Sequence, residues 1–239
     1  MTIGVYRPGT SIFYLSYSNS PGYAEIAVEY GQNGDLPVTG DWDGNGTDTI
    51  GVYRPKNSTF YLRNTIGRGA PDIIVAYGKP GDIPVVGDWN GDGVTTIGVY
   101  RQSDSTFYLR NSNTPGEPEL SVQFGKTGDI PVAGDWNGDH IATIGVFRPK
   151  DSVFYLRNTN SAGPADIVVP FGDESCIPVV GDWDGNGTAT IGAFIFGPNV
   201  AYFSLLNSNV FGSPEFSIPF GTPGDKPVAG KWATPYIAP

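Results

Sequence analysis

Apolar residues occur along the whole chain in short runs that are separated by clusters of Gly, Pro, Asn, Asp and Ser. In the first complete example, Val, Ile, Tyr or Phe predominate at 37–42, 49–55, 58–64 and 72–77, with turn-forming residues between these segments. Runs of this length are typical of β-strands, whereas an amphipathic helix would repeat its apolar residues roughly every 3.6 positions. The pattern predicts an all-β protein with four short strands in this stretch.

The same four-strand pattern repeats with a period that the tryptophans mark. These are Trp42, Trp89, Trp136, Trp183 and Trp232, separated by 47, 47, 47 and 49 residues. Each of them follows Gly-Asp, except the last, which follows Gly-Lys. A period of about 40–50 residues that contains four strands is typical of a propeller blade, and 239 residues hold five such periods. The sequence therefore predicts a five-bladed β-propeller with four antiparallel strands per blade.

The two ends of the chain supply parts of one blade. Residues 2–8 repeat the sequence at 49–55, so the chain begins at the second strand of a blade, and residues 227–230 repeat the innermost strand. We expect this C-terminal strand to join three N-terminal strands and close a monomeric ring, because pairing removes exposed sheet edges. The single domain, 1–239, then has blade 1 at 1–31 plus 225–239, blade 2 at 35–78, blade 3 at 82–125, blade 4 at 129–172 and blade 5 at 176–221. Loss of the last dozen residues should open the ring.

A pair of opposite charges recurs at one position in four of the five repeats. An antiparallel hairpin centred on Asn45 places residues whose numbers sum to about 89 or 90 opposite each other, which brings Asp35 beside Arg54. The equivalent pairs are Asp82 with Arg101, Asp129 with Arg148, and Asp225 with Arg7. In blade 5 both partners change together, to Cys176 and Ile195. We interpret the pairs as structural, because loss of one partner would leave a charge unpaired. The alternative is a ring of ligand-binding charges at the channel mouth.

Glycine and aromatic residues also recur at fixed positions. Glycine stands in the innermost strand at 40, 87, 134, 181 and 230, where it permits close approach of the backbone at the axis. The five tryptophans either pack between blades or form an aromatic ring that stacks on sugars, and we favour packing. Tyr61, Tyr108 and Tyr155 leave the same two interpretations open.

The loops between the first and second strands are rich in oxygen-bearing side chains. In the loop that begins at Asp41, these side chains fall at positions 1, 3 and 5, with glycine at position 6 for a sharp turn. This is the spacing with which a short loop wraps a hard cation such as calcium. The candidate ligands are Asp41, Asp43, Asn45, Thr47 and Thr49 in blade 2, Asp88, Asn90, Asp92 and Val94 in blade 3, Asp135, Asn137 and Asp139 in blade 4, and Asp182, Asp184, Asn186 and Thr188 in blade 5. The alternative is a hairpin closed by its own hydrogen bonds, which needs no ion.

With these loops, the chain resembles the FG-GAP and VCBS-type repeats of extracellular propellers, including those of integrin alpha subunits. The resemblance covers all five repeats in outline and implies calcium in the loops and an extracellular or cell-surface location. It is incomplete at position 9, where the family usually has an acid and this chain has threonine (Thr49, Thr96, Thr143 and Thr190). His140 replaces the turn glycine in blade 4, and Lys231 begins a loop without ligands in blade 1. We therefore expect weak calcium binding, strongest at 41–49 and 182–190.

Charge and composition exclude several classes of function. The formal net charge is −10, which disfavours binding to nucleic acid and to anionic lipid surfaces. No segment approaches the roughly 18 apolar residues of a membrane-spanning helix, and no signal-peptide pattern precedes Thr2. The lone Cys176 forms no intrachain disulfide and leaves the cellular compartment open.

The residues give little support to catalysis. The single histidine, His140, occupies a turn position, and nearly all acids recur from blade to blade, whereas a catalytic pair needs an acid and a base in unlike environments. A unique site would have to use the exceptional residues of blade 5 or the terminal segment 233–239. We expect a non-catalytic binding or adhesion module that recognises a glycan or a protein through its loops. The alternatives are a multivalent lectin, an architectural repeat unit and, least favoured, a glycosidase.

Overall fold

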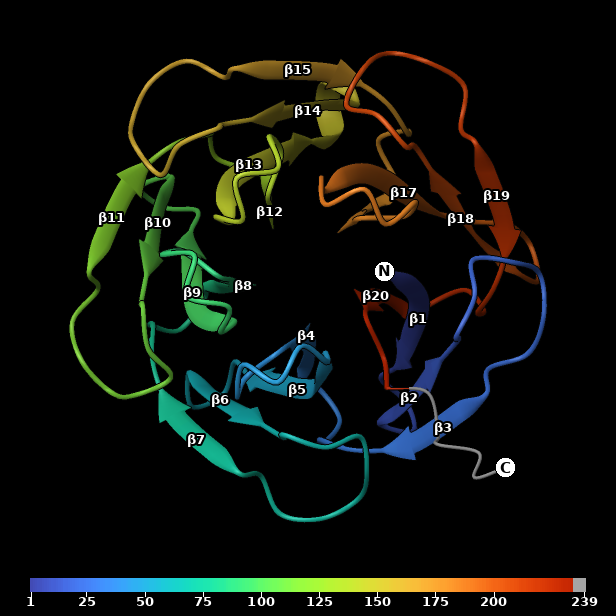
Figure 1. Cartoon of the computed structure of the whole chain (residues 1–239), viewed down its shortest axis with the longest axis horizontal. Helices are drawn as coiled ribbons and strands as arrows, with labels where there is room; N and C mark the ends of the chain where they lie inside the picture. The colour runs from blue at the N-terminus through green and yellow to red at the C-terminus, as the bar shows by residue number, and fades with distance from the viewer. Residues whose placement is uncertain (234–239) are drawn as a thin grey trace.

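The computed structural model describes residues 1–233 and consists of five four-stranded antiparallel sheets around a central axis (Figure 1). Each sheet is one blade, and its strands follow one another from the axis outwards. The predicted five-bladed propeller is therefore confirmed. The strands are four to seven residues long, and turns rich in Gly, Pro and Asn separate them.

The strands fall into four sets by their distance from the axis. The innermost strands are β4 (Leu36–Gly40), β8 (Ile83–Gly87), β12 (Ile130–Gly134), β16 (Ile177–Gly181) and β20 (Lys226–Gly230). The second strands are β1 (Thr2–Arg7), β5 (Thr49–Arg54), β9 (Thr96–Arg101), β13 (Thr143–Arg148) and β17 (Thr190–Phe196). The third strands are β2 (Ile12–Leu15), β6 (Thr59–Leu62), β10 (Thr106–Leu109), β14 (Val153–Leu156) and β18 (Ala201–Leu205). The outer strands are β3 (Ile26–Glu29), β7 (Ile73–Ala76), β11 (Leu120–Gln123), β15 (Ile167–Pro170) and β19 (Phe216–Pro219), and a single 3-10 turn, η1 (Pro149–Asp151), separates β13 from β14.

Blade 1 combines the two ends of the described chain. Its sheet has the order β20-β1-β2-β3, and β20 pairs antiparallel with β1 from Thr2 opposite Gly230 to Tyr6 opposite Lys226. The innermost strands of neighbouring blades contact one another all the way round the axis (Figure 1). The ring is closed by strand pairing between the ends of the sequence, as predicted.

The hairpin register also agrees with the sequence prediction. Gly40 lies opposite Thr49 and Leu36 opposite Tyr53, so paired residue numbers sum to 89. The innermost strand ends at Gly40 and not at residue 42, which places Trp42 just beyond it. A Cβ atom on Gly40 would lie only 2.4 Å from a methyl carbon of Thr95 in the next blade. Glycine is required there because the neighbouring blade approaches so closely.

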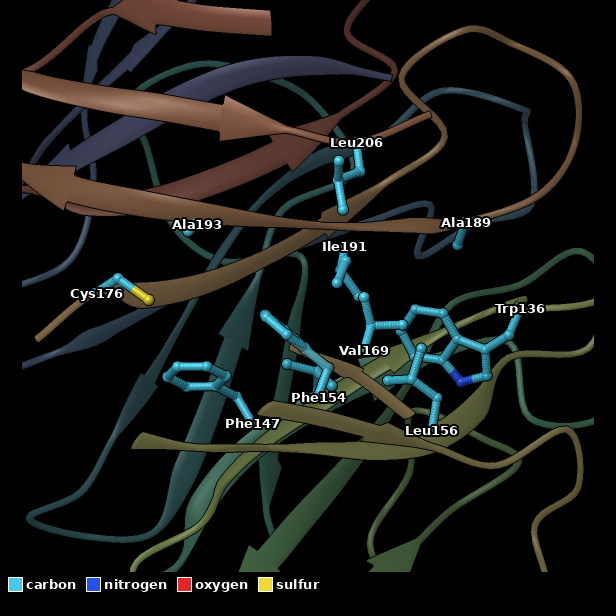
Figure 2. Close-up of a cluster of buried hydrophobic side chains, with 11 residues drawn as sticks. Trp136, Phe147, Phe154, Leu156, Val169, Cys176, Ala189, Ile191, Ala193 and Leu206 are labelled. Atoms are coloured by element: carbon cyan, nitrogen blue, oxygen red, sulfur yellow. The ribbon is translucent and has the colours of Figure 1, made fainter. Parts of the chain in front are cut away.

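The core lies between the blades rather than within a single sheet. Each tryptophan packs against the second strand of the next blade; Trp136, for example, shares a cluster with Ile191 and Leu206 of blade 5 (Figure 2). The five indoles are only 3–6% exposed. Their faces are therefore covered, and the structure supports the packing interpretation over sugar stacking for all five weak candidates, Trp42, Trp89, Trp136, Trp183 and Trp232.

Candidate functional site

The loops between the innermost and second strands are closed by their own hydrogen bonds. In blade 3 the Asp88 carboxylate accepts from the N–H groups of Gly91, Asp92 and Gly93 at 2.8–3.1 Å. The side chains at positions 3 and 5 contact each other, since the Asn90 amide donates to Asp92 at 2.9 Å. The same pattern recurs in blades 4 and 5, whereas the Asp41 carboxylate of blade 2 accepts from two N–H groups. Hydrogen bonds from the Asn137 side chain and the Ile141 N–H lower the pKa of the exposed Asp139.

These loops offer oxygen atoms of the kind that calcium takes as ligands, but not a complete ligand set. Positions 1, 3 and 5 bring only two carboxylates per loop, and among residues 1–233 no group of three or more Asp, Glu, His or Cys side chains gathers as a metal site. The position 9 threonine does not serve the loop. Thr96 is buried and its hydroxyl contacts the carbonyl oxygens of Gly87 and Arg110 at 3.2 and 2.7 Å, and Thr49, Thr143 and Thr190 do the same. Threonine at this position ties three strands together and is not available as a ligand.

Each of the four predicted ion pairs is present. Arg101 donates through Nε and Nη2 to the two carboxylate oxygens of Asp82 at 2.9 and 2.8 Å. The other three pairs, Arg54 with Asp35, Arg148 with Asp129 and Arg7 with Asp225, have the same bidentate geometry at 2.8–2.9 Å. The aspartates are 2% exposed and also accept a backbone N–H, in blade 3 that of Lys79. The pairs therefore fix the turn that enters each blade.

The arginines of these pairs also form part of a surface. The guanidinium carbon of Arg101 lies 4.3 Å from the ring centroid of Tyr108, within the range of a cation–π contact. Arg54 over Tyr61 and Arg148 over Tyr155 have the same separation, and Arg7 lies 4.7 Å from the centroid of Tyr14. Aspartate, arginine and tyrosine thus form one layered unit in four blades. This unit places the repeated tyrosines, for which the sequence left two interpretations, at partly exposed positions.

Three grooves lie at equivalent positions between neighbouring blades, and each is lined by one such Arg-Tyr unit. The first groove, between blades 1 and 2, has a volume of about 450 Å³ and is lined by residues that include Tyr30, Gly31, Arg54, Tyr61, Arg68, Gly69 and Pro71. The second groove, between blades 2 and 3, has about 390 Å³ and is lined by residues that include Tyr77, Gly78, Lys79, Arg101, Tyr108, Gly116 and Pro118. The third groove, between blades 3 and 4, has about 590 Å³ and is lined by residues that include Phe124, Gly125, Lys126, Arg148, Tyr155, Gly163 and Pro164. Volumes of this order suit small ligands, and the linings combine aromatic faces with a few polar groups.

The axial channel is a fourth hollow of different character. It has a volume of about 490 Å³ and is walled by Pro, Val, Ala and Gly of the innermost strands. Asp48, Asp88, Asp135, Asp182 and His140 also line it. Asp48 is buried, which raises the pKa of its carboxyl, and it accepts the N–H of Lys231 at 2.6 Å between blades 2 and 1. The carboxylates at position 1 of the loops accept hydrogen bonds from the backbone of their own loops. These acids at the end of the channel therefore have a structural role.

Of the exceptional residues of blade 5, Cys176, Ile195 and Leu206 lie in the core, whereas Phe196 is exposed. Cys176 is 3% exposed, burial raises the pKa of its thiol, and it packs with Leu206 and the partly buried Ile195. Figure 2 shows Cys176 at one end of this cluster and Trp136 at the other. Cys176 and Ile195 stand at the positions that the ion pair occupies in the other blades. Of the terminal segment 233–239, residues 234–239 lie outside the described part of the chain.

The grooves were not predicted from the sequence, although part of their signal is visible there. Their walls come from two repeats, and only the ring geometry shows which residues of one repeat face the next. The repeated Tyr61, Tyr108 and Tyr155 are the part that the sequence marks. Glycines at 31, 78 and 125, each beside an aromatic residue, are the other part, and their positive φ values of 92–93° explain why glycine stands there.

A scan against protein-family models and searches of curated proteins and of solved structures found no match to this chain. Within residues 1–233, no helix has the length and apolar character needed to cross a membrane.

Proposed function

We propose that the protein is a non-catalytic, multivalent binding module in which neighbouring blades hold a ligand between them. The observation that carries this proposal is the repetition of one groove, with one Arg-Tyr unit, at three equivalent positions. Repeated weak sites suit a ligand that is itself repetitive, because simultaneous binding multiplies a modest affinity. A glycan has this character, so the favoured function is that of a lectin-like module.

The chemistry of the grooves supports a carbohydrate ligand. Tyrosine offers an apolar ring with a polar edge, and arginine offers donors for hydroxyl oxygens. The lysines at the rims of the second and third grooves add further donors. A protein ligand is the second candidate, and it is favoured by the different rims, since an Arg68–Glu29 pair at 3.2 Å borders the first groove alone. An extracellular or cell-surface location is part of the proposal through the family resemblance.

We propose a protein without catalytic activity because its buried carboxylates are equivalent from blade to blade. The buried aspartates of the four ion pairs each bind one arginine and one backbone N–H in the same way. An acid-base pair needs two groups whose environments separate their proton affinities. Carboxylates that repeat in each blade and already accept hydrogen bonds from the protein favour a structural role in a binding module.

Replacement of the groove tyrosines is expected to abolish glycan binding. The triple variant Tyr61→Ala/Tyr108→Ala/Tyr155→Ala removes one wall of each groove and the ring that supports the arginine. On a glycan array, wild-type protein should bind a defined class of glycans and the triple variant should lose at least about 10-fold in affinity, as expected when a buried aromatic contact is lost.

Tyr202→Ala is the matched control for this experiment. Tyr202 lies on the third strand of blade 5, opposite Ile195, and Ser204 stands at the position of the groove tyrosines. Tyr202 is not among the lining residues of the three grooves, so its loss should leave binding intact. A thermal melt verifies that each variant is folded at the assay temperature. Binding that survives in the folded triple variant would place the ligand elsewhere on the propeller.

The proposal also includes weak calcium binding by the loops between the innermost and second strands. This binding should change the stability of the propeller and not its ligand affinity. If each of four loops binds with a Kd of about 1 mM, then 1 mM calcium adds about 0.4 kcal/mol per loop. Together this should raise the melting temperature by about 3–6 °C over a chelator. Asp43→Asn and Asp184→Asn should reduce the shift, and magnesium serves as the control. An unchanged midpoint in 10 mM calcium would mean that internal hydrogen bonds alone close the loops.

A further inference from the structure

The first and second grooves differ from the other interblade positions by a buried hydroxyl. Tyr30 and Tyr77 line these two grooves, and both side chains are more than nine-tenths buried, at 7% and 8% exposure. Neither hydroxyl has a hydrogen-bond partner among the described residues. A buried hydroxyl without a partner costs stability, and here it lies at the wall of a groove in both cases.

A second buried group without a partner accompanies each hydroxyl. Nε of Arg63 and Nε of Arg110 are buried and unpaired, although their other nitrogens bind the loop that follows the third strand. The nearest carboxylate oxygen to Arg63 Nε belongs to Asp72 at 4.0 Å, beyond hydrogen-bond range. Among charged groups, Arg63 acts most strongly on Tyr30, and Arg110 most strongly on Tyr77. Burial itself raises the pKa of Tyr30 to about 12, so the phenol is neutral.

The remaining repeats show that the two groups occur together. Phe124 replaces the tyrosine in the third groove, and there Nε of the following arginine, Arg157, has a partner in the carbonyl of Ser161 at 3.2 Å. In the last two repeats phenylalanine is again present, at Phe171 and Phe220, and the arginine is replaced as well, by Leu206 and Ser16. At this position of the repeat, an unpaired tyrosine hydroxyl is present only in the two repeats whose following arginine has an unpaired Nε. The buried hydroxyl of Tyr53, on a second strand, also lacks a partner.

We propose that the floors of the first and second grooves are pockets that each recognise one ligand hydroxyl, through Tyr30 with Arg63 and through Tyr77 with Arg110. This rests on the proposed function of the grooves. Arg Nε only donates, and a tyrosine hydroxyl donates or accepts, so an oxygen with lone pairs and one hydrogen satisfies both groups. A neutral sugar hydroxyl is such a group. Because both protein atoms are shielded from solvent, entry requires a small outward shift of the loop at Gly69 or Gly116.

The proposal makes the five interblade positions unequal. The first two grooves have the Arg-Tyr wall and the proposed hydroxyl pocket, whereas the third groove has the wall alone. The position between blades 5 and 1 also has the wall alone, through Arg7 and Tyr14, and the position between blades 4 and 5 lacks the wall arginine because Ile195 stands there. A ligand that depends on the hydroxyl should therefore occupy two strong sites per chain.

The test uses the full chain and a panel of methyl pyranosides with their monodeoxy derivatives, titrated by calorimetry. Tyr30→Phe/Tyr77→Phe should weaken the best glycoside about 5–10-fold, as expected for one lost hydrogen bond. One monodeoxy derivative should weaken wild-type binding by a similar factor and bind the variant without further loss. The variant should melt no lower than wild type, because it loses only unpaired hydroxyls. Tyr202→Phe is the control and should change neither binding nor melting.

The outcomes separate this inference from the proposed function. If glycosides bind wild type and Tyr30→Phe/Tyr77→Phe equally well, each pocket holds a buried water only and the inference is wrong, while the grooves remain binding sites. If no glycoside binds wild type, the carbohydrate function and the inference both fail.

Discussion

A chain that ends at Gly224 is expected to lose the cooperative folding of the propeller. This truncation removes β20, and with it the pairing to β1, the Asp225–Arg7 ion pair and the buried Trp232. Loss of a buried tryptophan side chain alone costs about 3–5 kcal/mol, and loss of one partner of a buried ion pair costs about as much again. Since small proteins are stable by only about 5–15 kcal/mol, the open ring should not persist.

Circular dichroism and a thermal melt measure this effect. A chain that ends at Ala233 keeps the described contacts and is the matched reference for this melt. A peptide of residues 225–239 should restore the cooperative transition when it is added to the truncated chain. A truncated chain that melts like the full one would show that the ring does not depend on closure by β20.

The second large effect concerns the ion pair of blade 3. Asp82→Ala leaves the Arg101 guanidinium, whose side chain is 18% exposed, without its carboxylate and leaves the Lys79 N–H without its acceptor. We expect a loss of about 3 kcal/mol, or roughly 6–12 °C in melting temperature. The double variant Asp82→Cys/Arg101→Ile copies blade 5, where the apolar pair packs in the core, and should recover most of this loss.

A thermal denaturation series under reducing conditions compares wild type, Asp82→Cys, Arg101→Ile and the double variant Asp82→Cys/Arg101→Ile. If the melting temperature of the double variant falls by as much as the two single decreases added together, or by more, the structural role of the pairs is contradicted. Such a result would favour the alternative interpretation, in which these charges serve ligands.

The sequence predicted the fold well because five copies of one pattern constrain one another. The hairpin register could be derived from Gly40 and Thr49, since a shift by one residue would turn the apolar side chains outwards and separate Asp35 from Arg54. The aspartate and arginine of the repeat are replaced together in blade 5, by Cys176 and Ile195, and this joint change identified the two positions as partners from the sequence alone. The end of the innermost strand was predicted less well: the sequence placed it at residue 42, but the strand ends at Gly40, and Trp42 beyond it packs against the next blade.

The candidate site was harder to predict because it lies between repeats. Position 9 of the loop carries an oxygen-bearing side chain, so the sequence made Thr49 a candidate ligand. In the structure its hydroxyl lies inside the blade and contacts the carbonyl oxygens of Gly40 and Arg63. The pairing of Tyr30 with Arg63 is visible in the sequence only as a correlation over 33 positions. Tyr30 and Arg63 belong to neighbouring blades, and the geometry between blades depends on the curvature of the ring, which no local pattern encodes.

The most direct test of the central claim is a crystal structure of the protein soaked with the glycoside that binds most tightly. We expect ligand density against Tyr61 and Tyr108, in the first and second grooves, with one hydroxyl within hydrogen-bond distance of Tyr30 or Tyr77. Density confined to the axial channel or to the acidic loops, with all three grooves empty, would contradict the assignment of the interblade grooves as the binding sites.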